Sequence, residues 1–156
     1  MTVVGLVYIA FLLLSVAGGQ LRNVPLQLVA NATGLVLAAL LYWLFAPANP
    51  AIALALLPLA LIHYAAQAVG QLRADTGTLR LALLPFAVYL IVLGYLIVQS
   101  TFAPAGIGVL VILAGVGWLI TVVPGAPTWS TLVVVVFGGI VEVALAIWLL
   151  IAPIAP

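Results

Sequence analysis

Six long apolar runs, separated by short connections, make up nearly the whole sequence and constrain its fold more than any other feature. They cover roughly residues 3–17, 26–45, 51–69, 79–98, 107–123 and 131–151. A helix needs about 20 apolar residues to cross the hydrocarbon core of a bilayer, and most of the runs have that length. Because hydrocarbon offers no water to backbone groups, such runs must be helical. The sequence therefore predicts an all-α fold, a polytopic integral membrane bundle of about six transmembrane helices.

The connections between these runs are short and rich in residues that end helices. In chain order they read GGQLRNVP, PANP, GQLRADTGT, TFAPAG and PGAPTWS. Helices joined by such short loops are expected to be antiparallel neighbours. No connection is long enough for an extramembrane domain, so residues 1–156 are predicted to form a single transmembrane domain.

Charged residues make up only 3% of the chain, whereas a soluble domain carries about 25%. With so little polar surface, most of the exterior must face lipid or other apolar protein. The chain has no lysine and no cysteine, which excludes a Schiff base, a disulfide and an iron–sulfur cluster. One His, one Asp and one Glu do not complete a metal site within one chain.

Enzymatic and nucleic-acid-binding motifs are also missing from the sequence. It has no nucleophile elbow, no His-Glu-x-x-His motif and no P-loop. Its three arginines are too few for the basic stripe that binds a nucleic acid. The chain is therefore predicted to be non-enzymatic, with the lipid bilayer as its surroundings and no nucleic-acid partner.

The positions of the arginines predict an orientation. Arg22 lies between the first and second runs, and Arg73 and Arg80 lie between the third and fourth. Both connections fall on the same side of the membrane. The positive-inside rule makes that side cytoplasmic and places both termini outside.

Glu142 lies near the middle of the sixth run, within VFGGIVEVALAIW. A charged side chain at that depth costs roughly 2.5–3.5 kcal/mol, so an ionised Glu142 is not expected to face lipid. Gly138, Gly139 and Ala146 lie three or four residues away, on the same helical face. Small residues let another helix approach closely, so Glu142 is predicted to face protein.

Two neighbouring runs supply polar side chains that are candidates to meet Glu142. His63, Gln67 and Gln71 repeat every four residues and form one stripe on the third run. On the second run, Gln27 and Asn31 have the same spacing. At 1.5 Å per residue, His63 is expected about 10 Å and Glu142 about 20 Å from the same membrane surface, a difference that long side chains or water would have to bridge.

Small residues also form a helix-packing face on the fifth run. Gly108 and Gly115 are seven residues apart and so lie on one side of the helix. Such a face permits close contact with another helix of this chain or of a partner chain.

Three functional interpretations fit these residues. In the first, the polar groups bond to one another and fix helix packing, and the chain is an accessory subunit of a larger membrane complex, such as a respiratory or photosynthetic assembly, or self-associates. In the second, Glu142 and the His63–Gln67–Gln71 stripe line a proton or solute path. In the third, His63 is an axial ligand of a haem or chlorin, although the sequence favours no particular cofactor.

Three stretches of the chain resemble a known family. They are LYWLFAPANPAIALALLPL (residues 41–59), LGYLIVQSTFAPAGIGVLVILAGVGWLI (93–120) and GGIVEVALAIWLLI (138–151). Together they are similar to the bacterial membrane-protein family called domain of unknown function 4386. Tyr42, Pro47 and Asn49 match its pattern after the second span, and Glu142 and Trp148 match its terminal motif. The resemblance implies about six spans in a bacterial inner membrane, and it implies no activity.

The resemblance and the local charges predict opposite orientations. Family members usually carry arginine in the loops after the second and fourth spans, which implies termini inside. In this chain those positions, among them Ala46 and Ala105, are uncharged, and His63 stands about where the family often has an arginine.

Overall fold

The computed structural model describes residues 2–123 and 125–152, and all regular structure within them is helical. The helices are α1 (Thr2–Gln20), α2 (Val24–Phe45), α3 (Pro50–Leu54), α4 (Leu56–Arg73), α5 (Thr76–Gln99), α6 (Ala105–Val122) and α7 (Thr128–Ile151). Six segments are long and apolar enough to cross a membrane, with α3 and α4 together forming the third. The predicted all-helical membrane fold with six spans is confirmed.

Polar residues at the helix starts explain where several of these helices begin. The side chains of Asn23, Asn49 and Asp75 each accept a hydrogen bond from a backbone N–H two or three residues further on. Such caps satisfy donors that have no partner within the helix. Asp75 also accepts from the Thr78 hydroxyl, and this hydrogen bond lowers the pKa of the Asp75 carboxyl below its ordinary value of 3.8.

The third span is broken between α3 and α4 at Ala55. Pro58 lies in the first turn of α4 and has no N–H to donate to the carbonyl of Leu54, four residues earlier. The chain makes a tight turn there, with the Ala55 N–H donating to the Ile52 carbonyl at 3.1 Å. The second proline inside a span, Pro85, is accommodated within α5.

The α1–α2 and α4–α5 hairpins turn in the same way. In each, the N–H of the capping residue donates to a glycine carbonyl five residues earlier, Asn23 to Gly18 at 3.0 Å and Asp75 to Gly70 at 2.9 Å. The residue before each cap is left-handed, with φ of 49° at Arg22 and 51° at Ala74. These are Schellman-type helix ends. The sequence Gly-Gln-Leu-Arg occurs near both ends, at residues 19–22 and 70–73, but one position out of register with the turns.

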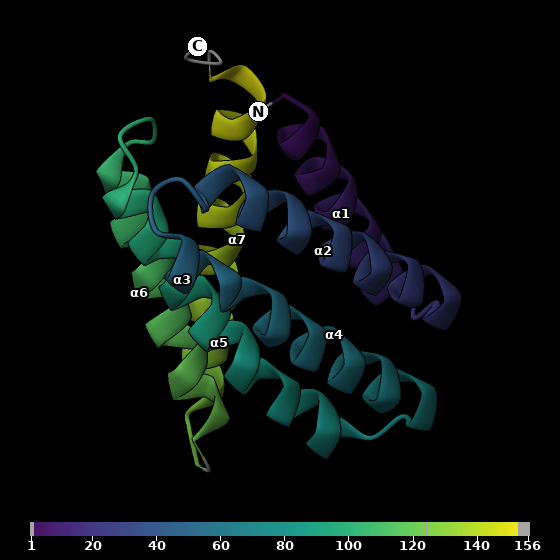
Figure 1. Cartoon of the computed structure of the whole chain (residues 1–156). Helices are drawn as coiled ribbons and strands as arrows, with labels where there is room; N and C mark the ends of the chain where they lie inside the picture. The colour runs from purple at the N-terminus through teal and green to yellow at the C-terminus, as the bar shows by residue number, and fades with distance from the viewer. Residues whose placement is uncertain (1, 124, 153–156) are drawn as a thin grey trace.

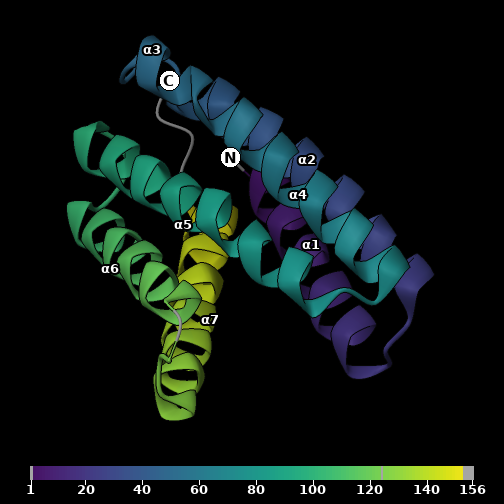
Figure 2. The same cartoon turned by 90° about the horizontal axis from the view of Figure 1, so that it is seen from below.

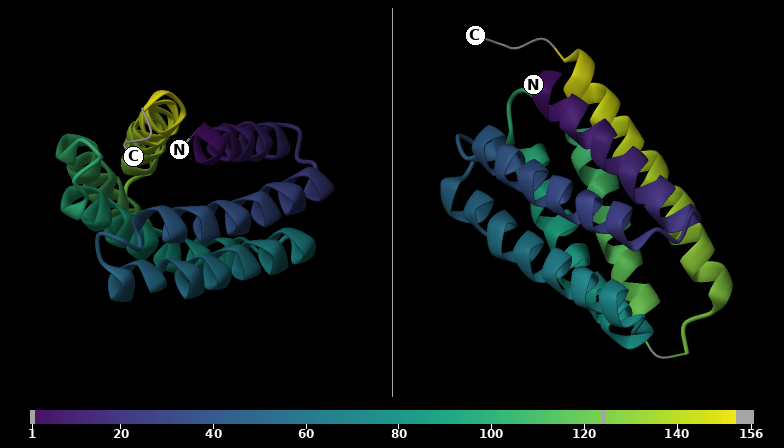
Figure 3. Two further views of the ribbon diagram at one scale, coloured as in Figure 1. Left: turned by 45° about the horizontal axis from the view of Figure 1, so that its top comes forward. Right: turned by 90° about the vertical axis from the view of Figure 1, so that its right-hand side faces the viewer.

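The six spans pack as a closed ring. Each helix contacts the next in the order α1, α2, α4, α5, α6, α7, and α7 returns to α1 (Figure 1). The contact that closes the ring is tight, because a Cβ added to Gly5 would lie 2.5 Å from the backbone nitrogen of Leu150. The first and last helices of the chain are thus neighbours, as the right-hand view of Figure 3 shows.

The apolar core fills one end of this ring. Fully buried side chains there include Leu41 and Phe45 on α2, Leu93 on α5, and Leu145 and Leu149 on α7. They lie in the half of the bundle nearest the described chain ends. Glycines bring α5 and α6 together in this region, since a Cβ on Gly94 would lie 2.6 Å from the Gly108 carbonyl oxygen.

The other end of the ring is spread apart. Figures 1 and 2 show the α6–α7 pair inclined away from α1, α2 and α4, so that the α1–α2 and α6–α7 connections lie far from each other. Arg22, Arg73 and Arg80 all lie at this end. Arg80 donates to the Val123 carbonyl at 2.8 Å and so ties the start of α5 to the end of α6.

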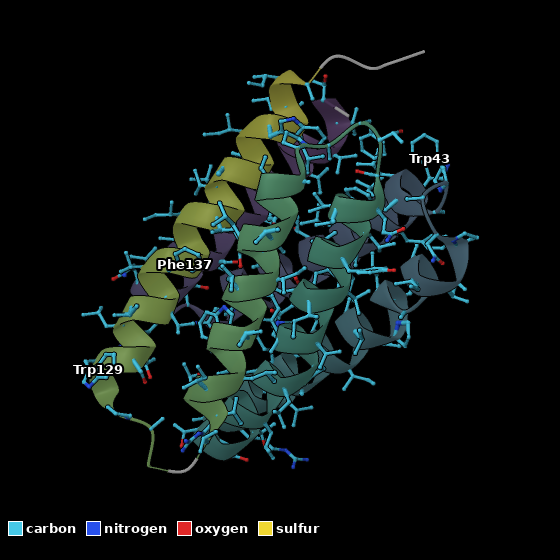
Figure 4. All side chains as sticks on the ribbon, turned by 90° about the vertical axis from the view of Figure 1, so that its left-hand side faces the viewer. Trp43, Trp129 and Phe137 are labelled. Carbon is cyan, nitrogen blue, oxygen red and sulfur yellow. The ribbon has the colours of Figure 1, made fainter. Side chains whose placement is uncertain are left out.

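Exposed tryptophans mark both ends of the apolar exterior. Trp43 projects from the end of α2, and Trp129 projects from the start of α7 at the opposite end (Figure 4). These positions suit an interfacial aromatic belt. Tyr64 and Trp118, in contrast, lie inside the bundle and pack on its other helices.

Candidate functional site

A cavity of about 540 Å³ lies inside the ring of helices. Its walls are supplied by α1, α2, α4, α5, α6 and α7, so that all six spans contribute. Pockets that hold small molecules have volumes of about 300–1,000 Å³. The cavity is therefore of a size that holds a small solute together with some water.

The polar residues singled out from the sequence gather in this cavity. It is lined by Gln27 and Asn31 from α2, by the α4 stripe of His63, Gln67 and Gln71, and by Glu142 from α7. Periodicity places each set on one face of its helix, and the closed ring turns the three faces toward one another. The structure thus brings to one cavity the polar residues that the sequence places on three different spans.

Two hydrogen bonds fix the mouth of the cavity. The Asn31 amide donates to the Gln71 side-chain oxygen at 3.0 Å and links α2 to α4. The Gln27 amide donates to the Gly18 carbonyl at 3.0 Å and links α2 to α1. Three of the predicted polar side chains therefore help to hold these helices together as well as lining the space between them.

His63 is buried and held from two sides. Its Nδ1 lies 2.7 Å from the carbonyl oxygen of Ala82. A carbonyl oxygen only accepts, so Nδ1 carries the proton. The imidazole stacks on Phe86 at 4.7 Å and meets the edge of Tyr64 at 4.6 Å. The imidazole is thus packed against two aromatic rings, and a haem or chlorin at His63 stays a prediction.

Glu142 is half-buried on the cavity wall. Among the described residues, none donates a hydrogen bond to its carboxyl group, and the bridge to His63 considered from the sequence is not formed. On the side away from the cavity mouth, α7 continues into the sealed core at Leu145 and Leu149. The carboxyl group therefore lies toward the closed end of the cavity without a protein partner among the described residues.

Aromatic side chains form a continuous arc around the cavity. Successive ring centroids are 6.0 Å apart from Phe11 to Tyr64, 4.6 Å from Tyr64 to His63, 4.7 Å from His63 to Phe86 and 5.9 Å from Phe86 to Trp118. The arc runs over α1, α4, α5 and α6, and α7 with Glu142 completes the enclosure. Sequence reasoning missed this arc, because no spacing within one helix reveals contacts among four.

The indole N–H of Trp118 is a second unusual feature of the cavity wall. Its indole Nε1 is buried and is the one such side-chain nitrogen or oxygen, among the described residues, without a hydrogen-bond partner. A buried N–H left unpaired costs about 1–3 kcal/mol. Trp118 packs beside Gly138, where a Cβ would lie 3.3 Å from Nε1.

The cavity opens toward the end of the bundle that carries the arginines. Its outermost lining residues, among them Gly19, Gln27, Gln71 and Leu79, all lie within about two turns of the α1–α2 and α4–α5 connections. At the other end, α1 and α7 touch at Gly5 and the core is closed. The site is therefore a vestibule with one open end and one sealed end.

The predicted packing glycines have different surroundings. Gly108 and Gly115 are buried against the backbone of α5 within this chain. Gly138 faces Trp118, whereas Gly139 lines the cavity and has nothing within 4 Å of the position of a Cβ. Gly139 thus adds to the space of the cavity and brings no second helix into close contact.

Comparison with known proteins gives one match. A protein-family model described as "Domain of unknown function (DUF4386)" matches residues 71–152. The match spans two of the three stretches that suggested this resemblance and leaves out residues 41–59. No curated protein and no solved structure matches the chain.

Proposed function

The chain belongs to the DUF4386 family, and from the cavity at its centre we propose that it is a small membrane carrier that binds a polar solute. The solute enters from the membrane face that carries the arginines and rests against Glu142. The proposal depends on one observation above all. Six polar side chains from three helices converge on a cavity that is large enough for a solute.

A purely structural role for these groups does not require that space. Polar side chains that only fix helix packing bond to one another in close contact, each contributing about 0.6 kcal/mol. Here Asn31 and Gln71 do so, but the Glu142 carboxyl and the Gln67 amide face the cavity without a described hydrogen-bond partner. Intramembrane ionisable groups in such positions are typical of substrate and ion pathways.

The shape of the bundle supports a carrier with one side open. The vestibule ends at a sealed core, and release on the far side requires that core to part. The α1–α7 contact at Gly5 is the natural place for this, because it closes the ring with backbone touching backbone. By the positive-inside rule, the open face with Arg22, Arg73 and Arg80 is cytoplasmic.

An accessory subunit is the competing proposal from the sequence. It relied on small-residue faces that would be free to receive another chain. Gly108 and Gly115 are already covered by α5 of the same chain, so that face is not available for a partner. The burial of these two glycines within the chain therefore weighs against the accessory subunit and supports the carrier proposal.

The test fills the cavity without disturbing the packing. In Gly139→Leu, the new side chain occupies open space within the cavity. The matched control is Gly106→Leu, since Gly106 also has nothing within 4 Å of a Cβ but lies outside the cavity lining. Purified variants are screened by thermal unfolding against amines, amino acids, polyols, nucleosides and carboxylic acids, and solutes that stabilise the protein are tested for uptake into proteoliposomes.

The expected result is that wild type and Gly106→Leu bind and take up at least one solute, whereas Gly139→Leu loses at least tenfold in binding. Equal behaviour of the two variants contradicts the proposal. So does the absence of any binding solute combined with recovery of the chain only in a stoichiometric complex with another membrane protein, which is the result expected of an accessory subunit.

A further inference from the structure

We propose that the solute held in the cavity is an organic cation, a substituted ammonium ion whose charge lies between Glu142 and the aromatic arc. This inference rests on the proposed function and names the chemical class of its solute. It is drawn from the charge of the lining, the arrangement of its rings and the size of the space.

The charge of the lining favours a cation. Among the described lining residues, Glu142 is the only acid, and none of the three arginines takes part. His63 donates its Nδ1–H to the Ala82 carbonyl, so this N–H is not available to the Glu142 carboxylate. A carboxylate in a low-dielectric site is stabilised only by a partner of opposite charge or by hydrogen bonds. A bound cation supplies the partner that the described protein groups do not.

The rings favour an organic cation over a bare metal ion. The faces of Trp, Tyr and Phe attract ammonium groups, and this attraction is strongest where water is excluded. Phe11, Tyr64, Phe86 and Trp118 line the same cavity as Glu142, so a cation beside Glu142 has aromatic rings around it. A bare Ca²⁺ or Mg²⁺ ion needs six or more oxygen ligands at about 2.0–2.6 Å, and an aromatic wall does not supply them.

The size of the cavity agrees with this class. A volume of about 540 Å³ is far larger than one ion requires and suits an ammonium group with several carbon substituents. Unbonded amide groups, such as that of Gln67, can contact polar substituents nearer the mouth. The arginines at the rim lie outside the lining, and Arg80 is occupied by the α6 carbonyls.

The experiment compares a cation with its neutral carbon isostere. Choline and 3,3-dimethylbutan-1-ol differ in that the quaternary nitrogen of one is a carbon atom in the other. Benzyltrimethylammonium serves as a larger cation and benzoate as an anion. Binding to the purified full-length protein in detergent is measured by titration calorimetry, at constant ionic strength and with sodium as the only other cation.

The two ammonium ions are expected to bind, and the neutral isostere and benzoate are not. Glu142→Gln should weaken cation binding at least tenfold, whereas Asp75→Asn, which removes the other acid of the chain outside the cavity, should leave it unchanged. Trp118→Leu should weaken binding roughly 3- to 30-fold, and Trp118→Phe, which also lacks the indole N–H but keeps a ring, should recover most of it. The unliganded unfolding temperature of each variant shows that it is folded.

Equal binding of choline and its isostere, or binding of benzoate, would overturn the cation assignment. In those cases a solute from the wider screen that binds wild type and not Gly139→Leu leaves the carrier proposal standing. If no solute of any class binds, both proposals fail together.

Discussion

At the scale of the single residue, the same side-chain type has different roles according to what surrounds it. Glycine shows this most clearly. Gly94 and Gly108 each face the backbone of the other's helix, whereas Gly106 and Gly139 face open space. Sequence spacing identified Gly108 as a packing position, but it gave Gly138 and Gly139 the same role, because it does not report which neighbour lies opposite.

Replacing Gly94 with alanine tests this distinction. The added Cβ would lie 2.6 Å from the Gly108 carbonyl oxygen, and rigid backbone has to move to admit it. Overpacking of this kind typically costs about 1–3 kcal/mol, so Gly94→Ala should lower the unfolding temperature in detergent. The control Gly106→Ala meets no atom within 4 Å and should be neutral or stabilising. Equal unfolding temperatures for the two variants would show that α5 and α6 are not in close contact.

Glu142 and Trp118 show how far single-residue reasoning from the sequence extends. The cost of a carboxyl group in hydrocarbon was enough to predict that Glu142 faces protein, and it lines the central cavity. Trp118 lies close to the end of its span, which is the usual position of a belt residue. Only the packing of α5 and α7 against α6 turns it into the bundle, and that packing is a property of the whole ring.

At the scale of the element, helix spans follow from hydrophobic length, and helix ends follow from local chemistry. Asparagine and aspartate caps explain why α2 and α5 begin before the apolar runs do. The break at Ala55 follows from Pro58, which has no N–H to donate within the helix. The two hairpin turns share their backbone geometry, and their left-handed residue is arginine in one and alanine in the other.

The left-handed alanine in the α4–α5 turn gives a prediction at this scale. Ala74 has a φ of 51°, a conformation that costs an L-residue about 1 kcal/mol and glycine almost nothing. Ala74→Gly should therefore stabilise the protein by up to about 1 kcal/mol, seen as a higher unfolding temperature. The control is Ala65→Gly, in the middle of α4, which should destabilise by about the same amount. Loss of stability in both variants would contradict the turn geometry.

At the scale of the whole molecule, six antiparallel spans were predictable and their circular order was not. Hydropathy does not report which helices meet across the bundle, so the α1–α7 contact and the open-ended cavity are seen only in three dimensions. The candidate site, too, was predictable in part. Its polar members could be chosen from the sequence, whereas their convergence and their aromatic surroundings could not.

Single-cysteine labelling tests the open and closed ends, and the chain has no native cysteine to remove. Ser15→Cys places a thiol on the cavity wall, and Leu13→Cys places one nearby on the lipid-facing side of α1. A membrane-impermeant maleimide should label Ser15→Cys from the arginine-bearing face only and Gly106→Cys from the other face only. Leu13→Cys should stay unlabelled, because neither water nor the reagent reaches it. Labelling of Ser15→Cys from the Gly106 side would place the opening at the wrong end.

The closure of the ring by its first and last helices also bears on how the protein is made. Gly5 and Leu150 are separated by nearly the whole length of the chain, yet their backbones touch. At about 5–20 residues per second, a ribosome needs roughly 5–25 s after making α1 before it has made α7. During that time the face of α1 that later packs on α7 is covered only by lipid or by the insertion machinery. The cavity then lacks the wall that α7 supplies. A chain halted before its last span would enter the membrane without the helix that carries Glu142.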